Sequence, residues 1–348
     1  MLKILSIVGA RPQFIKAAVL RELFEKTEDI TEILIHTGQH YDVSMSDIFF
    51  KDLNINPAEY KLGIHGSGAG DTTGRMLAEI EKVLVLEKPE AVLVYGDTNS
   101  TLAGALAATK LHIPLIHVEA GLRSFNKKMP EEINRILTDH VSDILFCSTQ
   151  TGIDNLKNEG ITDNVFHVGD IMYDATLRAI REKEFVKELQ GIDLTVQNIA
   201  ACTIHRAENT DNPKNLKEIF HYLREQCNKY QIILPIHPRT KKAIQLHNVD
   251  TGRINLIDTI GYFEMQALLS ASKIVFTDSG GLQKEAFFHQ VPCVTLRNET
   301  EWVELVSSGW NRLWKNEDFL KPRFAVQEYG VGDCGVKIVE HLRKQYKK

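Results

Sequence analysis

The sequence predicts an α/β protein made of two Rossmann-like domains facing a central cleft. Its 348 residues exceed the roughly 250–300 that a single core usually organises. Short apolar, β-branched runs alternate with helix-like segments in two successive series, which is typical of parallel βαβ units. Polar residues follow several of these strands in both series. Because open α/β sheets bind ligands outside the carboxyl ends of their strands, the two sets of polar residues predict a cleft between the domains.

The first series predicts an N-terminal domain over residues 1–172. A helix is expected to begin at Pro130, because proline near a helix start and acidic residues in the first turn both favour that end. The glycine-rich run 66–74 is expected to be a mobile loop. The predicted strands are Lys3–Gly9, Ile30–Thr37, Ala91–Tyr95, Pro114–Val118, Ile144–Ser148 and Val165–Val168, with helices over Gln13–Glu25, Met45–Leu53 and Thr72–Leu86.

The second series predicts a C-terminal domain over residues 173–334. A basic amphipathic helix is expected at the end of the chain, over Val336–Tyr346. The predicted strands are Asn198–Ile204, Gln231–Ile236, Ile254–Asp258, Lys273–Thr277 and Cys293–Leu296.

Composition excludes several classes of partner. The formal net charge is −5 and no basic patch dominates, so no nucleic-acid partner is expected. The five cysteines form no CxxC pair, which favours a reducing compartment over a disulfide framework. The apolar start is too short for a signal peptide, and no stretch approaches the ~20 apolar residues that span a bilayer. We therefore expect a cytoplasmic protein with no membrane partner.

Metal and common cofactor motifs are missing from the sequence. There is no HExxH, and the HxxxH pair of His36 and His40 contains Gly38 at a strand end, so the two rings are not expected on one helix face. Neither GxGxxG nor the Walker pattern follows a strand, so NAD and ATP sites of those kinds are unsupported. No metal is expected.

The run FTDSGGLQKEA, Phe276–Ala286, joins a predicted strand to a predicted helix through two glycines. The first turn of a helix offers unpaired N–H groups and a positive dipole end, and Gly280 and Gly281 leave room for a phosphate. Ser279 adds a hydroxyl, and Glu285 lies one turn further on the same face, where it could accept from a ribose. The pattern fits a nucleotide diphosphate site or an ordinary N-capped helix.

Other polar residues at strand ends are open to two interpretations. Asp97 could be catalytic or cap the helix after Gly96, and Glu131 could be catalytic or complement a helix dipole. Glu119 follows an apolar strand, where burying a carboxylate is costly, which favours a function. His205, His237 and Arg11 could each bind an anion. Each also has a purely structural alternative. His205 could cap a sheet edge, His237 could belong to a turn, and Arg11 could pair with an internal carboxylate.

Several long motifs in order resemble those of the non-hydrolysing UDP-N-acetylglucosamine 2-epimerases, from the first strand to the last helix. They are GARPQFIK (Gly9–Lys16), GDTNS (Gly96–Ser100), HVEAGLRS (His117–Ser124), PEEINR (Pro130–Arg135), IHRAEN (Ile204–Asn209), HP (His237–Pro238) and TDSGGLQKEA (Thr277–Ala286). The resemblance implies a glycosyltransferase-B arrangement, a C-terminal helix (about 335–348) that returns to the first domain, and a homodimer.

The resemblance also implies a reaction without a redox cofactor. A base removes the C2 proton of a UDP-2-acetamido sugar while UDP leaves C1, and UDP then returns with protonation of the other face. The positions that match the family's essential groups are Asp97, Glu119, Glu131 and His205. Those that match or fall among substrate and UDP contacts are Arg11, Lys16, His205, His237, Ser279, Gly280, Gly281 and Glu285, with uracil expected near Tyr262 and Phe263.

Departures from the family pattern concern the substrate and its regulation. The run Thr300–Glu304 lacks the proline of a TERPE-like motif, the loop between Glu119 and Glu131 is shorter, and HTGQHYD spans His36–Asp42. These features resemble the branch of the family that acts on UDP-2,3-diacetamido-2,3-dideoxy-glucuronate. Lys127 and Lys128 could bind the C6 carboxylate of that sugar. Alternatively, these lysines could be solvated loop charges. The glycine-rich run 66–74 does not resemble a regulatory UDP-sugar site.

Other functions remain open on the sequence. A UDP-sugar-dependent glycosyltransferase of the same fold would use the same nucleotide half, although the three carboxylates of the first domain favour an epimerase. A hydrolysing epimerase or a non-catalytic UDP-sugar-binding regulator would also have the same nucleotide-binding second domain.

Overall fold

The computed structural model describes residues 1–39, 56–66, 68–181 and 186–346, and divides into two compact units. The first unit comprises residues 1–177 and 327–348, and the second comprises residues 178–326. The sequence analysis places these boundaries at 172/173 and 334/335. Among the described residues, no helix is long and apolar enough to cross a membrane.

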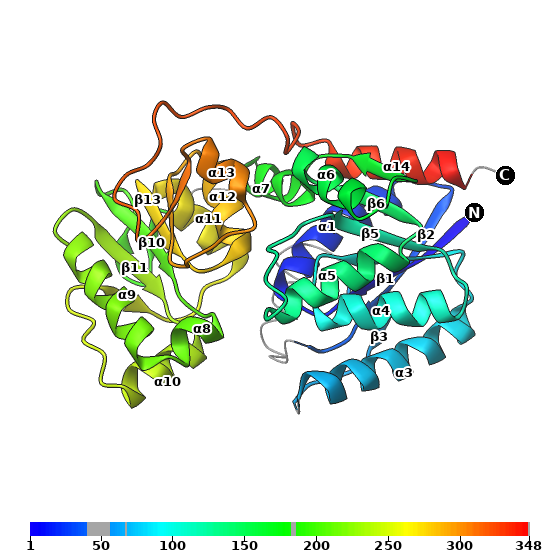
Figure 1. Cartoon of the computed structure of the whole chain (residues 1–348), viewed down its shortest axis with the longest axis horizontal. Coiled ribbons are helices and arrows are strands. Elements are labelled where there is room, and N and C mark those ends of the chain that lie inside the picture. The colour runs from blue at the N-terminus through cyan, green and yellow to red at the C-terminus, as the bar shows by residue number, and fades with distance from the viewer. Residues whose placement is uncertain (40–55, 67, 182–185, 347–348) are drawn as a thin grey trace. The chain divides into compact units, whose positions relative to one another are not determined.

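The first unit is built on a parallel sheet with the order β3-β2-β1-β4-β5-β6-β7 in the described ranges. Its central strand β4 is buried at every position, as expected for a sheet covered by helices on both faces (Figure 1). The strands are β1 Leu2–Val8, β2 Ile30–His36, β3 Tyr60–Lys61, β4 Ala91–Tyr95, β5 Leu115–Ala120, β6 Ile144–Cys147 and β7 Val165–His167. The helices are α1 Arg11–Glu25, α3 Ala69–Glu87, α4 Asn99–Lys110, α5 Pro130–Val141, α6 Gln150–Asn158, α7 Ile171–Arg181 and α14 Cys334–Gln345.

Helix α14, drawn in red in Figure 1, belongs to the first unit. Ile338 and Leu342 are fully buried in the core that α1 and β1 share. At the start of α14, the backbone N–H of Gly335 donates to the carboxylate of Asp174 in α7 (2.8 Å). The last helix of the chain therefore completes the core of the first unit.

The second unit has its own parallel sheet with the order β12-β11-β10-β13-β14-β15. Its strands are β10 Ile199–Thr203, β11 Gln231–Pro235, β12 Asn255–Ile257, β13 Ile274–Thr277, β14 Cys293–Thr295 and β15 Asn311–Leu313, with a small hairpin of β8 Glu188–Leu189 and β9 Ile192–Asp193. Its helices are α8 Ala207–Thr210, α9 Pro213–Gln226, α10 Pro238–Leu246, α11 Tyr262–Ala271, α12 Gly280–Phe288 and α13 Val303–Ser307.

The eleven strands expected from the sequence are all present, within two residues at each end, and the α/β class is confirmed. The short strands β3, β8, β9 and β15 were not expected, since two or three residues give no periodicity. The expected loop over 66–74 is wrong from Ala69 onward, because α3 begins there and Arg75 pairs with Asp71 one turn away (2.8 Å). The expected helix 45–53 and most of the motif after Gln39 lie outside the described residues.

Both sheets reverse their strand order at one point, which defines where polar residues gather. In the first unit the reversal lies between β1 and β4, and in the second between β10 and β13. Ligands of doubly wound sheets bind outside the carboxyl ends of the strands at this point. The loops after these strands carry most of the candidate residues.

Candidate active site

The ends of β1 and β4 are tied together by a buried amide. The Oε1 atom of Gln13 accepts from the backbone N–H groups of Gly9 (2.8 Å) and Ala10 (3.0 Å), while its Nε2 atom donates to the carbonyl of Tyr95 (2.7 Å). This amide fixes the turn from which Arg11 opens α1. Arg11 therefore lies at the strand-order reversal, where the sequence analysis expects a phosphate contact.

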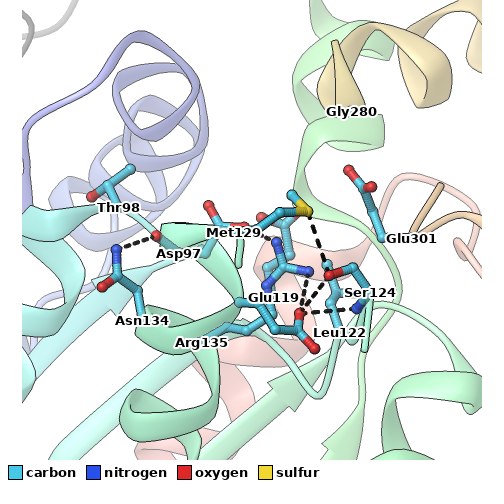
Figure 2. Close-up of polar contacts among 12 residues, drawn as sticks. Asp97, Thr98, Glu119, Leu122, Ser124, Met129, Asn134, Arg135, Gly280 and Glu301 are labelled. Atoms are coloured by element: carbon cyan, nitrogen blue, oxygen red, sulfur yellow. Dashed lines mark hydrogen bonds and ion pairs between the residues drawn. The ribbon is translucent and has the colours of Figure 1, made fainter. Parts of the chain in front are cut away.

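Asp97 follows β4 and is held by helix α5. Its Oδ2 atom accepts from Nη2 of Arg135 (2.5 Å), whose side chain is nearly buried. Figure 2 shows Asn134 reaching the backbone oxygen of Asp97, at 2.9 Å. Although Asp97 precedes α4, the oxygen that caps this helix belongs to Thr98, which accepts from the N–H of Thr101 (3.2 Å). The side chain of Asp97 is thus available for another role, with about a third of it exposed.

Glu119 sits at an irregularity near the end of β5. The pairing of β5 with β6 shifts between Val118 and Ala120, and Glu119 itself has a φ of +72°. A residue other than glycine in this region costs roughly 1–3 kcal/mol and is often found at functional sites. The Oε2 atom of Glu119 contacts Nζ of Lys16 from α1, and both side chains are largely buried. Lys16, expected among the substrate contacts, therefore neutralises a candidate catalytic carboxylate.

Glu131 and Glu132 open helix α5 but differ in surroundings. Glu131 is partly exposed, whereas Glu132 is fully buried and accepts from the N–H groups of Ser124 (2.9 Å) and Phe125 (2.8 Å). Nη1 of Arg135 lies 3.3 Å from Oε2 of Glu132. Glu132 therefore fixes the loop before α5, and Arg135 links that loop to Asp97.

In the second unit, Asp278 organises the reversal between β10 and β13. This fully buried carboxylate accepts from the N–H groups of His205 (3.0 Å) and Arg206 (3.0 Å) and from Nδ2 of Asn209 (3.1 Å). Nδ1 of His205 lies 3.2 Å from Oδ1 of Asp278. Burial acts to raise the pKa of Asp278, but these hydrogen bonds outweigh it and lower the pKa below its usual range. Asp278 thus holds His205 in place while leaving its ring 43% exposed.

His237 stands next to His205 in the same unit. Their ring centroids are 6.3 Å apart, and Nδ1 of His237 accepts from the N–H of Arg239 as the cap of α10 (3.2 Å). Burial, together with the nearby His205 and Arg239, lowers the pKa of His237. His237 therefore caps α10 beside His205, as one of the two sequence interpretations expects, and its lowered pKa favours the neutral ring.

The glycine run opens α12 as expected. Ser279 is the N-cap, and its Oγ atom accepts from the N–H of Leu282 (3.4 Å). A Cβ atom at Gly280 would lie 2.2 Å from Oε1 of Glu301, whereas one at Gly281 would meet nothing closer than 3.9 Å. Gly280 is thus required by the protein itself, and Gly281 opens toward free space at the helix end that favours anions.

Glu285 is nearly buried on α12 and is held by α11. Its Oε2 atom accepts from Nε2 of Gln266 (2.5 Å), and Oε1 of Gln266 in turn pairs with Nε2 of His289 (2.7 Å). Tyr262 and Phe263 open α11, with Tyr262 buried. Glu285 and Gln266 therefore link α12 to α11, the helix that Tyr262 and Phe263 open.

Three further features bear on ligands. In the described part of the chain, no group of three His, Cys, Asp or Glu side chains could hold a metal ion. A hollow of about 430 Å³ in the second unit, between α10 and β12, is lined by Ile236, Lys241 and Asp258 among others and by none of the candidate residues. The candidate residues instead gather where each sheet reverses its order.

Sequence reasoning missed the residues that hold the candidates. Gln13, Glu132, Arg135 and Asp278 were not singled out, although all four stand inside quoted motifs. A charged residue directly after an apolar strand was the available signal for Asp278. No local signal identifies Arg135 as the partner of Asp97, since the two are 38 positions apart.

The fold and the two sets of side chains define an α/β protein of two Rossmann-like units, one presenting carboxylates and the other a helix end suited to a diphosphate. The family model for UDP-N-acetylglucosamine 2-epimerase matches residues 22–343. The chain belongs to this family of isomerases.

Relatives agree over nearly the whole chain. A UDP-2,3-diacetamido-2,3-dideoxy-D-glucuronate 2-epimerase of Pseudomonas aeruginosa is 54% identical, covering 99% of this chain and 100% of the relative. The structure of Methanocaldococcus jannaschii UDP-GlcNAc 2-epimerase with UDP-GlcNAc and UDP has a TM-score of 0.89 at 40% identity, covering 99% and 100% of the two chains. The Neisseria meningitidis UDP-GlcNAc 2-epimerase bound to UDP-GlcNAc has a TM-score of 0.88 at 30% identity, covering 99% and 100%. The predicted glycosyltransferase-B fold class is confirmed.

Proposed function

We propose that this chain inverts C2 of a UDP-2-acetamido sugar without net hydrolysis. The observation that carries the proposal is the pairing of Glu119 with Lys16 and of Asp97 with Arg135 where the first sheet reverses its order. Such pairing orients both carboxylates, as proton transfer requires. A glycosyltransferase or a non-catalytic binder would have little use for two carboxylates prepared in this way.

The reaction follows from the chemistry of the groups. The C2–H bond of a sugar is not acidic, so its proton must leave as the C1–O bond breaks and UDP departs. Asp97, Glu119 and Glu131 supply the proton-transfer groups and stabilise the positive charge that develops on the ring. UDP then re-adds to C1 of the 2-acetamidoglucal while a proton returns to the opposite face of C2. No redox step enters this balance.

The second unit is suited to retaining UDP between the two half-reactions. We assign the diphosphate to the first turn of α12 and to His205, which Asp278 orients, and one ribose contact to Glu285. Arg11 and His237 complete the cationic and polar contacts, and Tyr262 and Phe263 mark the uracil end.

Among substrates, we propose UDP-2,3-diacetamido-2,3-dideoxy-glucuronate as the preferred one. Support comes from the 54% identity to the Pseudomonas relative of that name, against 45% to the Methanocaldococcus jannaschii UDP-N-acetylglucosamine 2-epimerase over a similar length. Lys127 and Lys128 are exposed in the loop that Glu132 anchors and could pair with a C6 carboxylate. If these lysines are solvated loop charges instead, replacing both by Gln will leave the preference between the two substrates unchanged.

Proton NMR in D₂O tests the proposal directly. The protein is incubated with UDP-GlcNAc and, separately, with the 2,3-diacetamido-glucuronate analogue. We expect a new C2 epimer that carries deuterium at C2, formed faster from the analogue, with free UDP staying far below the epimer. Accumulation of free UDP with free sugar would indicate a hydrolysing enzyme. No epimer and no deuterium with either sugar would reject the epimerase and favour a transferase.

The setting of the activity is part of the same proposal. We infer a cytoplasmic homodimer that supplies an aminosugar nucleotide for surface polysaccharide, on the strength of the family. Light scattering after gel filtration tests the dimer, which has an expected mass near twice 39.4 kDa.

A further inference from the structure

A buried histidine in β5 contacts the segments on either side of it. His117 is fully buried, two positions before Glu119. Its Nδ1 atom lies 2.7 Å from Oδ1 of Asp139 in α5, and its Nε2 atom lies 2.8 Å from the carbonyl oxygen of Gly96. The ring therefore bridges α5 and the turn that carries Asp97.

The hydrogen bonds fix both nitrogens of this ring. The carbonyl of Gly96 can only accept, so Nε2 of His117 carries a proton. Asp139 is also fully buried and accepts from Nη1 of Arg123 (2.7 Å) and from the N–H of Gly121 (3.1 Å), as an ionised carboxylate does. Burial acts to raise the pKa of Asp139, but His117 and Arg123 outweigh it and lower the pKa. The ring of His117 is thus held between Gly96 on one side and Asp139 on the other.

The polar side chains of this cluster all have partners. Arg123 pairs with Asp139 and also, through Nε, with Oε1 of Glu159 (2.7 Å). His117 contacts the other oxygen of Asp139. A buried network is stable when every member has partners, as here, and strongly destabilised when one is removed. The cluster therefore fixes the backbone segments that its members contact.

The segments held are those that bear the candidate carboxylates. Gly96, with φ +61°, immediately precedes Asp97, and Gly121, with φ +80°, follows the irregularity at Glu119. Glycines in this region move easily unless their backbone groups are fixed. His117 fixes the carbonyl of Gly96, and Asp139 fixes the N–H of Gly121. Asp139 lies on α5, the helix that Glu131 opens.

We propose that His117, held between Asp139 and the carbonyl of Gly96, is a positioning residue that sets the relative geometry of Asp97 and Glu119. The inference rests on the epimerase function proposed above. His117 does not itself contact the substrate. It acts by joining the turn after β4 to β5 and α5, so that the two carboxylates keep the spacing that proton removal and return require. Misplacement by about 1 Å can cost on the order of 100-fold in rate.

Two variants separate the contacts of His117. His117→Asn keeps a donor toward Asp139 but loses the bond to the carbonyl of Gly96, whereas His117→Gln can reach Gly96 but not Asp139. We expect kcat to fall about 100-fold in His117→Asn, with the KM and the Kd for UDP within about threefold, because His117 contacts none of the residues assigned to UDP and most of these lie in the other unit. His112→Asn, an exposed histidine of the same unit, is the matched control and should keep wild-type kcat.

A second measurement avoids the risk that a variant fails to fold. Nitrogen-15 NMR of the wild-type protein labelled at histidine should show Nε2 of His117 protonated and hydrogen-bonded, as the contact with the carbonyl of Gly96 requires. A spectrum in which Nε2 of His117 carries no proton, or a folded His117→Asn with wild-type kcat, would overturn the proposal. A fall in kcat that merely follows a loss of folded protein would also count against it. The NMR result does not depend on activity, so failure of the epimerase proposal would be seen separately, as absence of turnover in the wild type.

Discussion

Glu32 on β2 offers a test of the structure through the pH dependence of stability. Its carboxyl group is buried, accepts from Oγ of Ser6 (2.5 Å) and lies 3.4 Å from Nη1 of Arg21, which also pairs with Glu59. Burial raises the pKa of Glu32 to about 7, against the opposing effects of Ser6 and Arg21. The unfolded chain has the ordinary value near 4.5. The folded state therefore keeps a proton that the unfolded state releases.

The sign and size of the effect follow from this difference. A raised folded-state pKa contributes stability that is fully present below about pH 4.5 and is lost as the pH rises through about 7. At about 1.4 kcal/mol per pH unit, the whole window corresponds to about 3 kcal/mol, and the interval from pH 5.5 to pH 8 to about 2 kcal/mol. In Glu32→Gln this contribution is missing. We expect the variant to gain about 2 kcal/mol on the wild type between these two pH values.

Hydrogen exchange provides the assay, because it reports on each unit separately. Exchange of peptides from β1 and β2, corrected for the intrinsic effect of pH, gives the opening free energy of the first unit. Trp302, Trp310 and Trp314 all lie in the second unit, so their fluorescence in urea is an internal control that should not change. Glu28→Gln, an exposed site, is the matched variant. Equal differences between wild type and Glu32→Gln at pH 5.5 and pH 8 would refute the reasoning.

Three further outcomes are expected. Glu119→Gln should reduce turnover by about 10³-fold, the scale of general acid–base catalysis, while the UDP affinity measured by calorimetry stays unchanged. Turnover comparable to that of the wild type would show that Glu119 is not part of the mechanism. Gly280→Ala should displace Glu301 and alter tryptophan fluorescence in the free protein. Gly281→Ala should leave the free protein unchanged and weaken UDP binding about tenfold. Identical behaviour of the two variants would contradict the assignment of the diphosphate to this helix end. Asp278→Asn should weaken UDP binding about tenfold, since charge-assisted bonds to it are worth about 1.5–3 kcal/mol each, and an unchanged Kd would show that it has no role in orienting this site.

The sequence reached far where the signal is local. Buried parallel strands read as short continuous apolar runs, so the strand positions and the α/β class followed from the residues themselves. Proline and acidic residues marked the start of α5, and the Ser-Gly-Gly run marked the start of α12, because these residue types satisfy a helix end directly. The candidate list followed from positions directly after strands, together with the family motifs.

The tertiary structure decided what holds each candidate residue. Lys16 meets Glu119 across 103 positions, Arg135 meets Asp97 across 38, and Asp278 meets His205 across 73. No local pattern fixes such partners, because they depend on which strands become neighbours and in which register. The φ of +72° at Glu119 likewise arises from the irregular pairing of β5 with β6. The sequence by itself determined which residues stand at the strand ends. Only the packing of distant segments decided their charge, orientation and exposure, since each of these depends on neighbours that the chain brings together when it folds.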